Sequence, residues 1–599
     1  MKPNSRIRIL IHIAESFFTT WALMEAGGLQ PGNILTGAFF LLSFFFYLRL
    51  PSHLEKKPFM QTALVKRTAL IIGILFTVLY MAVDAPNYIG SLTNPLFRFC
   101  ILAASFIGFS ILFYKLLLLL FSYSGDKQLL HDLICSTKEN ELGHFYQKHA
   151  PACGFAICLL CWLPYFLYQY PGIILTDSIT QLEQVMGLSP YSNHHPVVHT
   201  LLILIFYRLG SLFTSDMLIA ISFYTVFHMC FMAFCVAYLI KTLRIYQVRP
   251  LLCFVITLFY ALVPYNAVFA VNIWKDTIFA GFVLLFGCSM LRLIRNCKPF
   301  NLILFILSGI MICLMRSNGW YGFLASLPFL LYHYRERAKK FYPALAAIFL
   351  AAAVIKYPIM NAFHVIQPDL IESLSIPTQQ VAAVINNDRE LTSEQLDLIG
   401  NVVNLPYVKE LYDPALADYM KELVRAGNQA YLADHKKEFL SLYLKLGVTY
   451  PGDYIKAYID QTYGYWHPGA YHMTAEGEGI SPNTLGLSTR NLIRGPFVIK
   501  IKEIAIKLGS MLPLYGLIWN MGSAFWFFIF CIGTVIIRGE KKKLIYFLTS
   551  FTLYLTVLIA TPVANEFRYV YFMMFSLPFY AMTAFMTLPL PCDIPHKAE

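Results

Sequence analysis

Long apolar runs recur along this chain, and they constrain its fold more than any other feature. A helix needs roughly 20 apolar residues to cross a hydrocarbon core about 30 Å thick, and runs of about this length occur repeatedly. Hydrophobic residues make up 58% of the sequence and charged residues only 13%, far from the values of soluble globular chains. The runs do not alternate as barrel strands do, so they predict an all-α polytopic membrane protein.

These runs predict about 14 transmembrane helices. The expected spans are 8–25, 33–49, 69–83, 97–121, 152–170, 217–240, 250–270, 277–293, 300–315, 320–334, 342–357, 515–537, 544–562 and 568–588. No small-residue cleavage pattern follows the first run, so the segment from residue 1 onward is expected in the mature protein.

Lys and Arg residues gather between alternate spans, and short basic loops stay on the cytoplasmic side of a membrane. The clusters lie at residues 2–8, 49–67, 127–148, 241–249, 292–298, 335–340 and 538–543. Placing all of them inside puts both termini in the cytoplasm. Alternation then requires the segment 197–213 to lie along the outer interface as a helix that does not cross. The net charge of +12 reflects this asymmetry and an attraction to anionic membrane lipid, with no part for nucleic acid.

The segment 357–510 is the longest polar stretch, and the topology makes it an extracytoplasmic domain. Residues 1–150 then form an N-terminal extension of about four spans. Residues 151–356 form a transmembrane module with an outer loop at 171–216, and residues 511–599 form the C-terminal spans. None of the 13 cysteines lies within 357–510, so the outer domain is not a disulfide scaffold.

Capping and turn residues predict that the outer domain is mainly helical. Leu391-Thr-Ser-Glu-Gln is typical of a helix start with Thr392 or Ser393 as the cap. A further helix is expected over 427–447, and Tyr450-Pro-Gly-Asp is expected to break it. The following residues are aromatic and expected to be rich in turns. Among them, Tyr465 and Trp466 are candidates to stack on a sugar or acceptor, with an aromatic belt at the lipid headgroups as an equal alternative.

Ionisable residues flank four of the outer connections. They are Asp177 with His194 and His195, Lys275 with Asp276, Arg316, and Glu566 with Arg568. Charged groups at a membrane face are costly unless they have partners or a function. Their convergence from distant parts of the sequence on one face is what a site between helices requires. We therefore expect these side chains to form one site.

Structural alternatives exist for the first three connections. Asp177 could cap the helix that follows it, and Lys275 with Asp276 could be an interfacial pair. Arg316 could anchor a helix end, although basic residues are disfavoured on the outer side.

The remaining groups have structural alternatives as well. Glu566 and Arg568 could form a local ion pair of little energetic value. His194 and His195 suit packing or capping better than metal ligation, because adjacent side chains point in different directions.

The residue types favour group transfer from a phosphate. A carboxylate can take a proton from an acceptor hydroxyl, which makes the acids of these connections candidates for a general base. Cations can hold a phosphate and stabilise its charge as it leaves, which assigns Arg316, Arg568 and Lys275 to the donor. The other ionisable residues of these connections, His194, His195 and Glu566, are expected to support them.

The order of elements resembles the start of the GT-C glycosyltransferases: an apolar helix, an outer loop with Asp177, a helix led by Pro196, and a span ending in a basic inside loop. Those enzymes are polytopic and use lipid-phosphate sugars. The resemblance implies acids in two successive outer loops that act as base or metal ligand, which match Asp177 and Asp276. This chain has Thr-Asp-Ser where better-known members have paired Asp-Glu, so a divalent metal cofactor stays an open option.

A closer resemblance covers the chain from about residue 150 onward. The segments that carry it are Ile376-Pro-Thr-Gln-Gln, Leu391-Thr-Ser-Glu-Gln, Tyr450-Pro-Gly-Asp-Tyr-Ile, Tyr463-Gly-Tyr-Trp and Glu566-Phe-Arg-Tyr. They are similar to a bacterial family of multi-spanning proteins defined by a domain of unknown function. This resemblance implies a place in the bacterial cytoplasmic membrane.

The expected function is inverting transfer of a sugar from a polyprenyl-phosphate donor to a cell-envelope glycan or protein on the outer face. A glycan polymerase or ligase shares this donor and differs only in the acceptor. A transporter or flippase of lipid-linked glycan would need charges deep within spans, where His228 and Glu15 are the candidates. A sensor or scaffold is the non-enzymatic alternative.

Overall fold

The computed structural model describes residues 5–90, 92–135, 143–295, 298–470, 472–475, 477–493 and 496–587. Among these residues the chain is helical throughout, with isolated backbone bridges and no strand. The all-α class predicted from the apolar runs is therefore confirmed.

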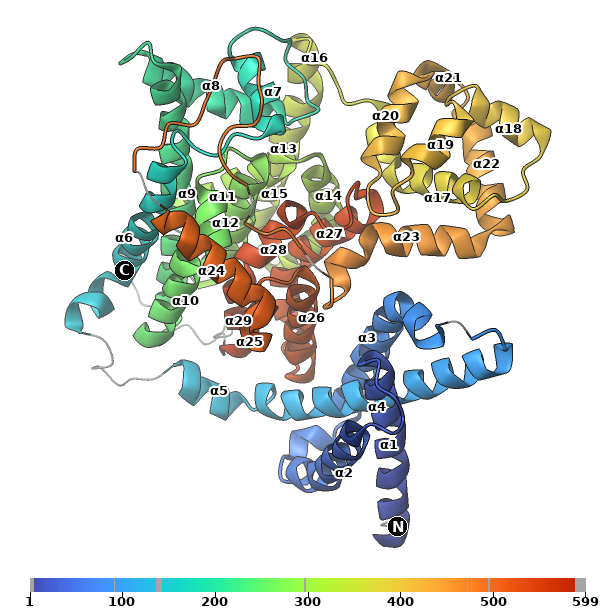
Figure 1. Cartoon of the computed structure of the whole chain (residues 1–599). Helices are drawn as coiled ribbons and strands as arrows, with labels where there is room; N and C mark the ends of the chain where they lie inside the picture. The colour runs from blue at the N-terminus through green and yellow to red at the C-terminus, as the bar shows by residue number, and fades with distance from the viewer. Residues whose placement is uncertain are drawn as a thin grey trace.

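The N-terminal helices form a group of their own, drawn in blue in Figure 1. They are α1 (Ser5–Ala26), α2 (Ile34–Glu55), α3 (Ala63–Ile89), α4 (Pro95–Ser124) and α5 (Lys127–Ile134). Helix α1 packs against α2 and α4, and α4 packs against α3. Glu15 of α1 pairs with Lys115 of α4 at 2.8 Å and with His12 at 2.9 Å. The acid within the first apolar run thus has partners inside the group.

The second group surrounds a central helix, α12. Its members are α6 (His144–Tyr168), α7 (Thr176–Val185), α8 (Val197–Ser211), α9 (Met217–Ile245), α10 (Pro250–Leu262), α11 (Pro264–Ala270), α12 (Lys275–Arg295), α13 (Pro299–Met315), α14 (Ser317–His333), α15 (Ala338–Val354) and α16 (Met360–Ala362). In the most apolar 18-residue stretch of α12, 94% of the residues are buried, whereas in that of α2 only 17% are buried. Because α12 contacts α9 and α13 along its length, its first residues lie at the end of a packed bundle.

Residues 370–466 are called the outer group because they lie outside the bundle, and they form a separate lobe to one side of it in Figure 1. It comprises the 3-10 turn η4 (Leu370–Leu374), α17 (Ser375–Asn386), α18 (Ser393–Gly400), α19 (Leu405–Leu411), α20 (Asp418–Ala426), α21 (Gln429–Asp434), α22 (Lys436–Thr449) and α23 (Pro451–Trp466). It has an apolar core of its own, which includes Ile371, Val384 and Leu446. Thr392 caps α18 in a capping box with Gln395, as the sequence predicted.

The predicted break at Tyr450 is confirmed, because α22 ends at Thr449 and α23 begins at Pro451. The prediction that the aromatic residues beyond this break are rich in turns is wrong as far as Trp466, because α23 continues to that residue. Proline is favoured at the first position of a helix, because its missing N–H has no intrahelical partner there. Tyr465 and Trp466 therefore lie on the last turn of a helix.

The C-terminal helices return to the bundle. They are α24 (Phe497–Met511), α25 (Pro513–Leu517), α26 (Met521–Ile537), α27 (Ile545–Ala560), α28 (Tyr571–Phe575) and α29 (Leu577–Phe585), with the 3-10 turns η5 (Lys541–Leu544) and η6 (Phe567–Val570). Helix α27 packs against α14, α28 packs against α12, and α26 packs against α23 of the outer group. The C-terminal helices thus contact both the bundle and the outer group.

The described residues contain 9 helices that are long and apolar enough to cross a membrane, or up to 10 if the bent pair α10 and α11 is one span. The predicted count of 14 is not confirmed. Helices α13 and α26 are shorter apolar helices, α14 has 17 residues, and the last predicted span is divided into η6, α28 and α29. At 1.5 Å per residue, 17 residues extend over about 25 Å, which is less than a typical hydrocarbon core.

Helix α8 is the element expected along the outer interface. It has 15 residues and packs along α9. A helix of this length is too short to cross the bilayer unaided, and its place at the interface stays a prediction.

Candidate functional site

The extended segment between α6 and α7 determines where the site lies. Ile173 donates a backbone hydrogen bond to Val271 at 2.9 Å and accepts one from Ile273 at 3.0 Å. On its other edge, Ile174 donates to Gly479 at 3.0 Å. This pairing places the start of α7 beside the start of α12, two elements that are far apart in the sequence.

Gly172 permits this close pairing. Its φ is +143°, a conformation that residues with a Cβ rarely adopt. A Cβ at this position would lie 2.7 Å from the Thr225 hydroxyl oxygen and 3.0 Å from the Val271 carbonyl oxygen. The glycine of the 171–178 segment is thus required by its neighbours.

Asp177 lies between two cations. Its Oδ2 accepts hydrogen bonds from Lys275 Nζ at 2.9 Å and from Arg568 Nη1 at 2.9 Å. Leu175 is the N-cap of α7, and no side chain caps this helix. The structure therefore does not bear out the alternative in which Asp177 acts as a cap. Its side chain is 25% exposed, so one side of the carboxylate remains accessible.

The two adjacent histidines face different parts of the molecule. His195 Nδ1 accepts a hydrogen bond from Lys275 Nζ at 3.1 Å and lies 3.8 Å from Asp177. His194 lies 3.9 Å from Glu372 of η4, and its side chain is 45% exposed. Only His195 belongs to the charge cluster.

Asp276 follows Lys275 in sequence but pairs with a different cation. Its side chain is fully buried and accepts a hydrogen bond from Arg316 Nη1. Arg316 is the residue between α13 and α14, and its guanidinium lies 4.9 Å from the centre of the Tyr569 ring. The alternative in which Lys275 and Asp276 form an interfacial pair is therefore not what the structure shows.

Arg568 connects the C-terminal part of the chain to the cluster. Its Nε lies 3.4 Å from Glu566 Oε1, so the local ion pair considered as a structural alternative is present. The same guanidinium also reaches Asp177, and it lies 5.2 Å from the ring centre of Trp274. All four charged connections thus meet, and the expectation that they form one cluster is supported.

The loop before Glu566 rests on the outer group. Ala564 N–H donates to the Ala415 carbonyl at 2.9 Å. A Cβ at Gly464 of α23 would collide with the Asn565 side chain and the Ala564 carbonyl. The outer group therefore helps to position the segment that carries Arg568.

Tyr465 and Trp466 lie behind this loop. Tyr465 is fully buried and donates its hydroxyl hydrogen bond to the Val563 carbonyl at 2.6 Å. Trp466 is 5% exposed and donates to the Thr462 hydroxyl at 3.3 Å. Neither ring presents an open face in the structure, so their assignment to a sugar or acceptor stays a prediction.

Three helices begin at the cluster. Asp177 lies in the first turn of α7 and Asp276 in the first turn of α12, while α14 begins directly after Arg316. Helix N-termini carry partial positive charge and unpaired N–H groups, so they stabilise nearby anions. The cluster is therefore suited to hold a further anion.

Several buried polar atoms around the cluster have no hydrogen-bond partner among the described residues. They are Asp276 Oδ2, both amide atoms of Asn272, Trp274 Nε1 and Asn565 Oδ1. Most buried polar groups in folded proteins are satisfied by protein or water. The unused atoms next to the ion pairs therefore provide capacity for a polar ligand.

Burial and neighbouring charge shift the pKa values of three site residues. Burial alone would raise the pKa of Asp177, but the charges of Lys275 and Arg568 outweigh it and hold this pKa well below its usual range. Burial and the Lys275 charge lower the pKa of His195 to about 3, so its ring is neutral near pH 7. Burial raises the pKa of Glu566, and Arg568 offsets this only in part.

The residues of the cluster do not form a site for a divalent metal. In the described ranges, no three His, Cys, Asp or Glu side chains converge as ligands. The Asp177 oxygen that could bind a metal already carries two cationic side chains. The implied metal therefore has no fitting ligand set, and no step is assigned to it.

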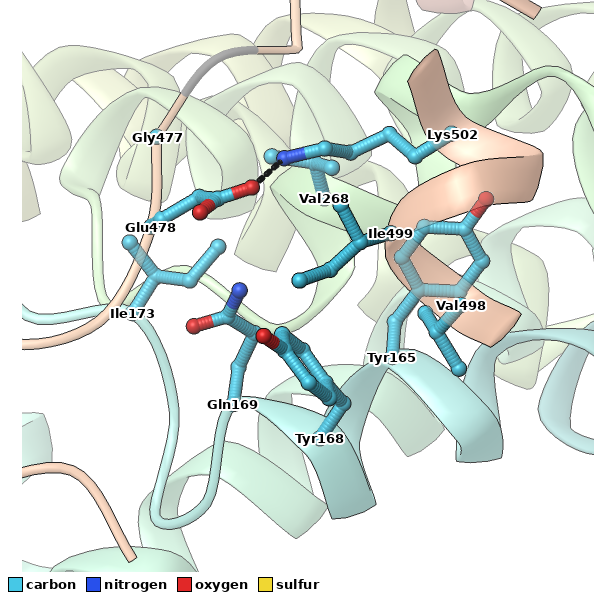
Figure 2. Close-up of a pocket in the computed structure, with 10 residues that line it drawn as sticks. All are labelled: Tyr165, Tyr168, Gln169, Ile173, Val268, Gly477, Glu478, Val498, Ile499 and Lys502. Carbon is cyan, nitrogen blue, oxygen red and sulfur yellow. Dashed lines mark hydrogen bonds and ion pairs between the residues drawn. The ribbon is translucent and has the colours of Figure 1, made fainter. Parts of the chain in front are cut away.

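A small niche lies between the end of α6 and α24 (Figure 2). It is lined by Tyr165, Tyr168, Gln169, Ile173, Val268, Gly477, Glu478, Val498, Ile499 and Lys502. An ion pair between Glu478 and Lys502 crosses one side of it (Figure 2). The niche shares Ile173 with the segment that leads to Asp177 but contains none of the predicted site residues.

Sequence analysis missed three neighbours of the cluster. Asn272 and Trp274 lie within the same connection as Lys275, and Tyr569 directly follows Arg568. Tyr569 separates the two guanidinium groups, with Arg568 at 5.3 Å from its ring centre. Their closeness in sequence to charged residues at an outer connection is the signal that could have identified them.

The chain matches the model of a family described as "Family of unknown function (DUF6020)" over residues 188–589, and it belongs to this family. The matched segment contains Lys275, Asp276, Arg316 and Arg568, and it begins just after α7, which carries Asp177. No curated protein and no solved structure matches the chain. The resemblance to a family of unknown function is thus confirmed, and the GT-C resemblance is not.

Proposed function

We propose that this DUF6020 family member transfers a sugar from a polyprenyl-phosphate donor to an acceptor hydroxyl on the outer face of the bacterial cytoplasmic membrane. The observation that carries the proposal is the position of Asp177 between Lys275 and Arg568, at the meeting point of three helix starts. A carboxylate held in this way occupies the place that a phosphate would take.

The arrangement of charge supports an anionic ligand. Three cations, Lys275, Arg316 and Arg568, face three carboxylates, and burial raises the pKa of Glu566. A phosphate that takes over Lys275 and Arg568 replaces the negative charge of Asp177 at these two cations.

In the proposed reaction the donor phosphate first takes over Lys275 and Arg568. Asp177 then loses the two charges that hold its pKa down, and it becomes a stronger base. The guanidinium plane of Arg568 suits two parallel hydrogen bonds to phosphate oxygens, while Lys275 acts as a point charge.

The transfer step follows from these roles. The acceptor oxygen forms a bond to the anomeric carbon while the bond from that carbon to the phosphate oxygen breaks. Both electrons of the broken bond stay on the phosphate, where Lys275 and Arg568 stabilise the added charge. The acceptor proton passes to Asp177. Attack from the side opposite the phosphate inverts the configuration of the sugar.

Asp276 and Arg316 support this step from the buried side of the cluster. Asp276 holds the Arg316 guanidinium in one orientation, next to the Tyr569 ring. In the proposal, Arg316 adds a third positive charge on the donor phosphate, and Asp276 acts as its positioning residue. His195, which accepts from Lys275, positions the amine in the same way.

The same proposal includes a GT-C-like arrangement of 14 crossings, with α8 at the outer interface and both termini in the cytoplasm. It requires the outer end of α3 and the outer group to lie on one face. His467, which directly follows α23, lies 3.1 Å from Asp84 near the end of α3, and this contact supports the arrangement.

The test uses the full-length protein in lipid nanodiscs, with a panel of polyprenyl-phosphate sugars and a cell-envelope extract as acceptor. The measured quantity is released polyprenyl phosphate. Asp177→Asn should lower transfer by about 10²–10⁴-fold, the usual contribution of a general base. Farnesyl phosphate should bind this variant at least as tightly as the parent, because asparagine no longer competes for Lys275 and Arg568.

Asp216→Asn is the matched control. Asp216 caps α9 and pairs with Arg490 at 2.9 Å outside the cluster, and asparagine is an equally good cap. Its transfer should equal that of the parent. Undiminished transfer by Asp177→Asn would show that Asp177 is not the base, and lost farnesyl phosphate binding would contradict the exchange of Asp177 for phosphate.

A further inference from the structure

The outer group encloses a cavity of about 390 Å³ that lies apart from the charge cluster. Its walls come from η4, α17 and the helices from α18 to α22. Small-molecule sites have volumes of about 300–1,000 Å³. Protein interiors are otherwise packed as densely as organic crystals, so a hollow of this size within a small group of helices requires an explanation.

The lining is almost entirely apolar. Thr378, Lys436 and Tyr443 are the only polar side chains that line it. The Thr378 hydroxyl donates to the Leu374 carbonyl at 2.8 Å, and the Tyr443 hydroxyl donates to the Gln380 side chain at 2.6 Å. Water entering the cavity would therefore find few hydrogen-bond partners, and apolar cavities of this kind accept apolar ligands.

The opening of the cavity has a single cation. Lys436 begins α22 and is exposed, and Leu440, one turn later, is 57% exposed. Both residues line the cavity. Lys436 forms no ion pair with a residue in the described ranges. Its amine is therefore available to an anionic group at the entrance.

The burial of the lining residues favours a single chain over a helix of a partner protein. Lining residues such as Val408, Met420 and Val424 are 3%, 4% and 6% exposed. A docked helix with its side chains is about 10 Å across and needs a wide groove of exposed residues. A narrow space between buried side chains admits a flexible hydrocarbon chain instead.

We propose that this cavity binds the hydrocarbon chain of a single-chain amphiphile with an anionic head group. The chain lies between α17, α20 and α22, and the head lies beside Lys436. This site is separate from the sugar transfer proposed above. Its presence or absence is measured by binding, so the two proposals fail independently.

The test uses the full-length protein in nanodiscs of zwitterionic phospholipid, with a palmitate that carries a photoreactive diazirine at its chain end. After irradiation, the labelled peptides are identified by mass spectrometry. We expect adducts on η4, α17, α20 and α22, and competition by unlabelled palmitate or farnesyl phosphate. The better competitor identifies a carboxylate or a phosphate head. Labels confined to the membrane helices, or competition by neither compound, would overturn the proposal.

Two exposed leucines of α22 provide a matched pair. Leu440 and Leu444 are both 57% exposed, but only Leu440 lines the cavity. Leu440→Asp should lower labelling of the outer group about tenfold, equivalent to 1.4 kcal/mol, and Leu444→Asp should not. Equal labelling of the two variants would contradict the site. Both substitutions are at the surface, and equal melting temperatures will confirm that the fold is retained.

Lys436→Glu tests the head group separately. The parent should bind palmitate more tightly than palmityl alcohol, which lacks a charge. The variant should lose this preference while it still binds the alcohol, because the apolar lining is unchanged. A preference that survives the substitution would rule out Lys436 as the partner of the head.

Discussion

Two clusters of ion pairs in this protein contain the same residue types but differ in how many of their buried polar atoms have hydrogen-bond partners. In the outer group, Lys421 pairs with Glu372 at 3.0 Å, and Arg425 pairs with Asp369 at 3.2 Å. No buried polar atom of these four residues lacks a partner in the described part of the chain. Around Asp177, by contrast, Asp276 Oδ2 and neighbouring amide atoms remain without one.

The clusters also differ in what they connect. Glu372 and Arg425 are 53 residues apart and belong to one group of helices. Asp177 and Arg568 are 391 residues apart and join the beginning and end of the bundle. A complete, local network stabilises a fold, whereas an incomplete network assembled from distant segments has capacity left for a ligand.

The largest expected effect is on the stability of the buried pair. Arg316→Met leaves the fully buried Asp276 carboxylate without its cation, so the free energy of unfolding should fall by about 3–5 kcal/mol. Thermal unfolding in nanodiscs measures this change. Adding Asp276→Leu should restore most of the loss, since no charge is then left uncompensated. A single variant as stable as the parent would show that the pair is solvated and comparable to the outer cluster.

Arg568→Lys tests how much the site depends on the shape of the guanidinium. Lysine keeps the charge but loses paired hydrogen bonds to a phosphate. Farnesyl phosphate affinity and transfer should both fall by about 10–100-fold, the value of one charge-assisted hydrogen bond. Arg490→Lys, which alters an exposed pair with Asp216, serves as the control and should change neither.

His195 predicts a dependence of stability on pH. Its pKa is lowered to about 3 in the folded protein and returns to about 6.5 on unfolding. Below the unfolded value the unfolded state binds more protons, so this residue lowers stability as the pH falls from about 6.5 toward 3, by up to about 1.4 kcal/mol per pH unit. His195→Asn should reduce the difference between melting temperatures measured at about pH 7.5 and about pH 5. An unchanged difference would mean that the ring is protonated in the folded state.

The smallest effect is expected in the outer cluster. Glu372→Gln removes one carboxylate from a partly exposed network, so the free energy of unfolding should fall by about 1 kcal/mol or less. Transfer activity should stay at the parent value. A strong loss of transfer would show that the contact between Glu372 and His194 links the two clusters, which would end the contrast between them.

That the charged connections come together was predictable from the sequence, but their pairing was not. The positions of the basic loops predict that the connections of Asp177, Asp276, Arg316 and Arg568 share one face, and the structure brings them into one cluster. Which acid pairs with which cation depends on the direction in which each side chain points. Successive residues of a helix point about 100° apart, so Lys275 and Asp276 reach different partners.

Other features also needed the three-dimensional structure. His194 and His195 are adjacent in sequence, but only one reaches the cluster, because the chain between α7 and α8 is held by hydrogen bonds to Ile366 and turns one ring toward the outer group. The hydrophobic pattern of the helices in the outer group does not indicate that they surround a cavity. A hydrophobic periodicity reports which face of a helix is buried and not how tightly that face is packed.

Gly464 has a mechanical consequence. Helix α23 approaches the loop before Glu566 so closely that a Cβ at Gly464 would collide with the Asn565 side chain and the Ala564 carbonyl. A tilt of the outer group on this helix would therefore move the segment that carries Arg568. Movement of the lobe is thus transmitted to the bundle through the contact at Gly464. Exchanging residues 370–466 between members of the family should therefore preserve the geometry around Asp177 only where Gly464 is exchanged together with the loop that it contacts.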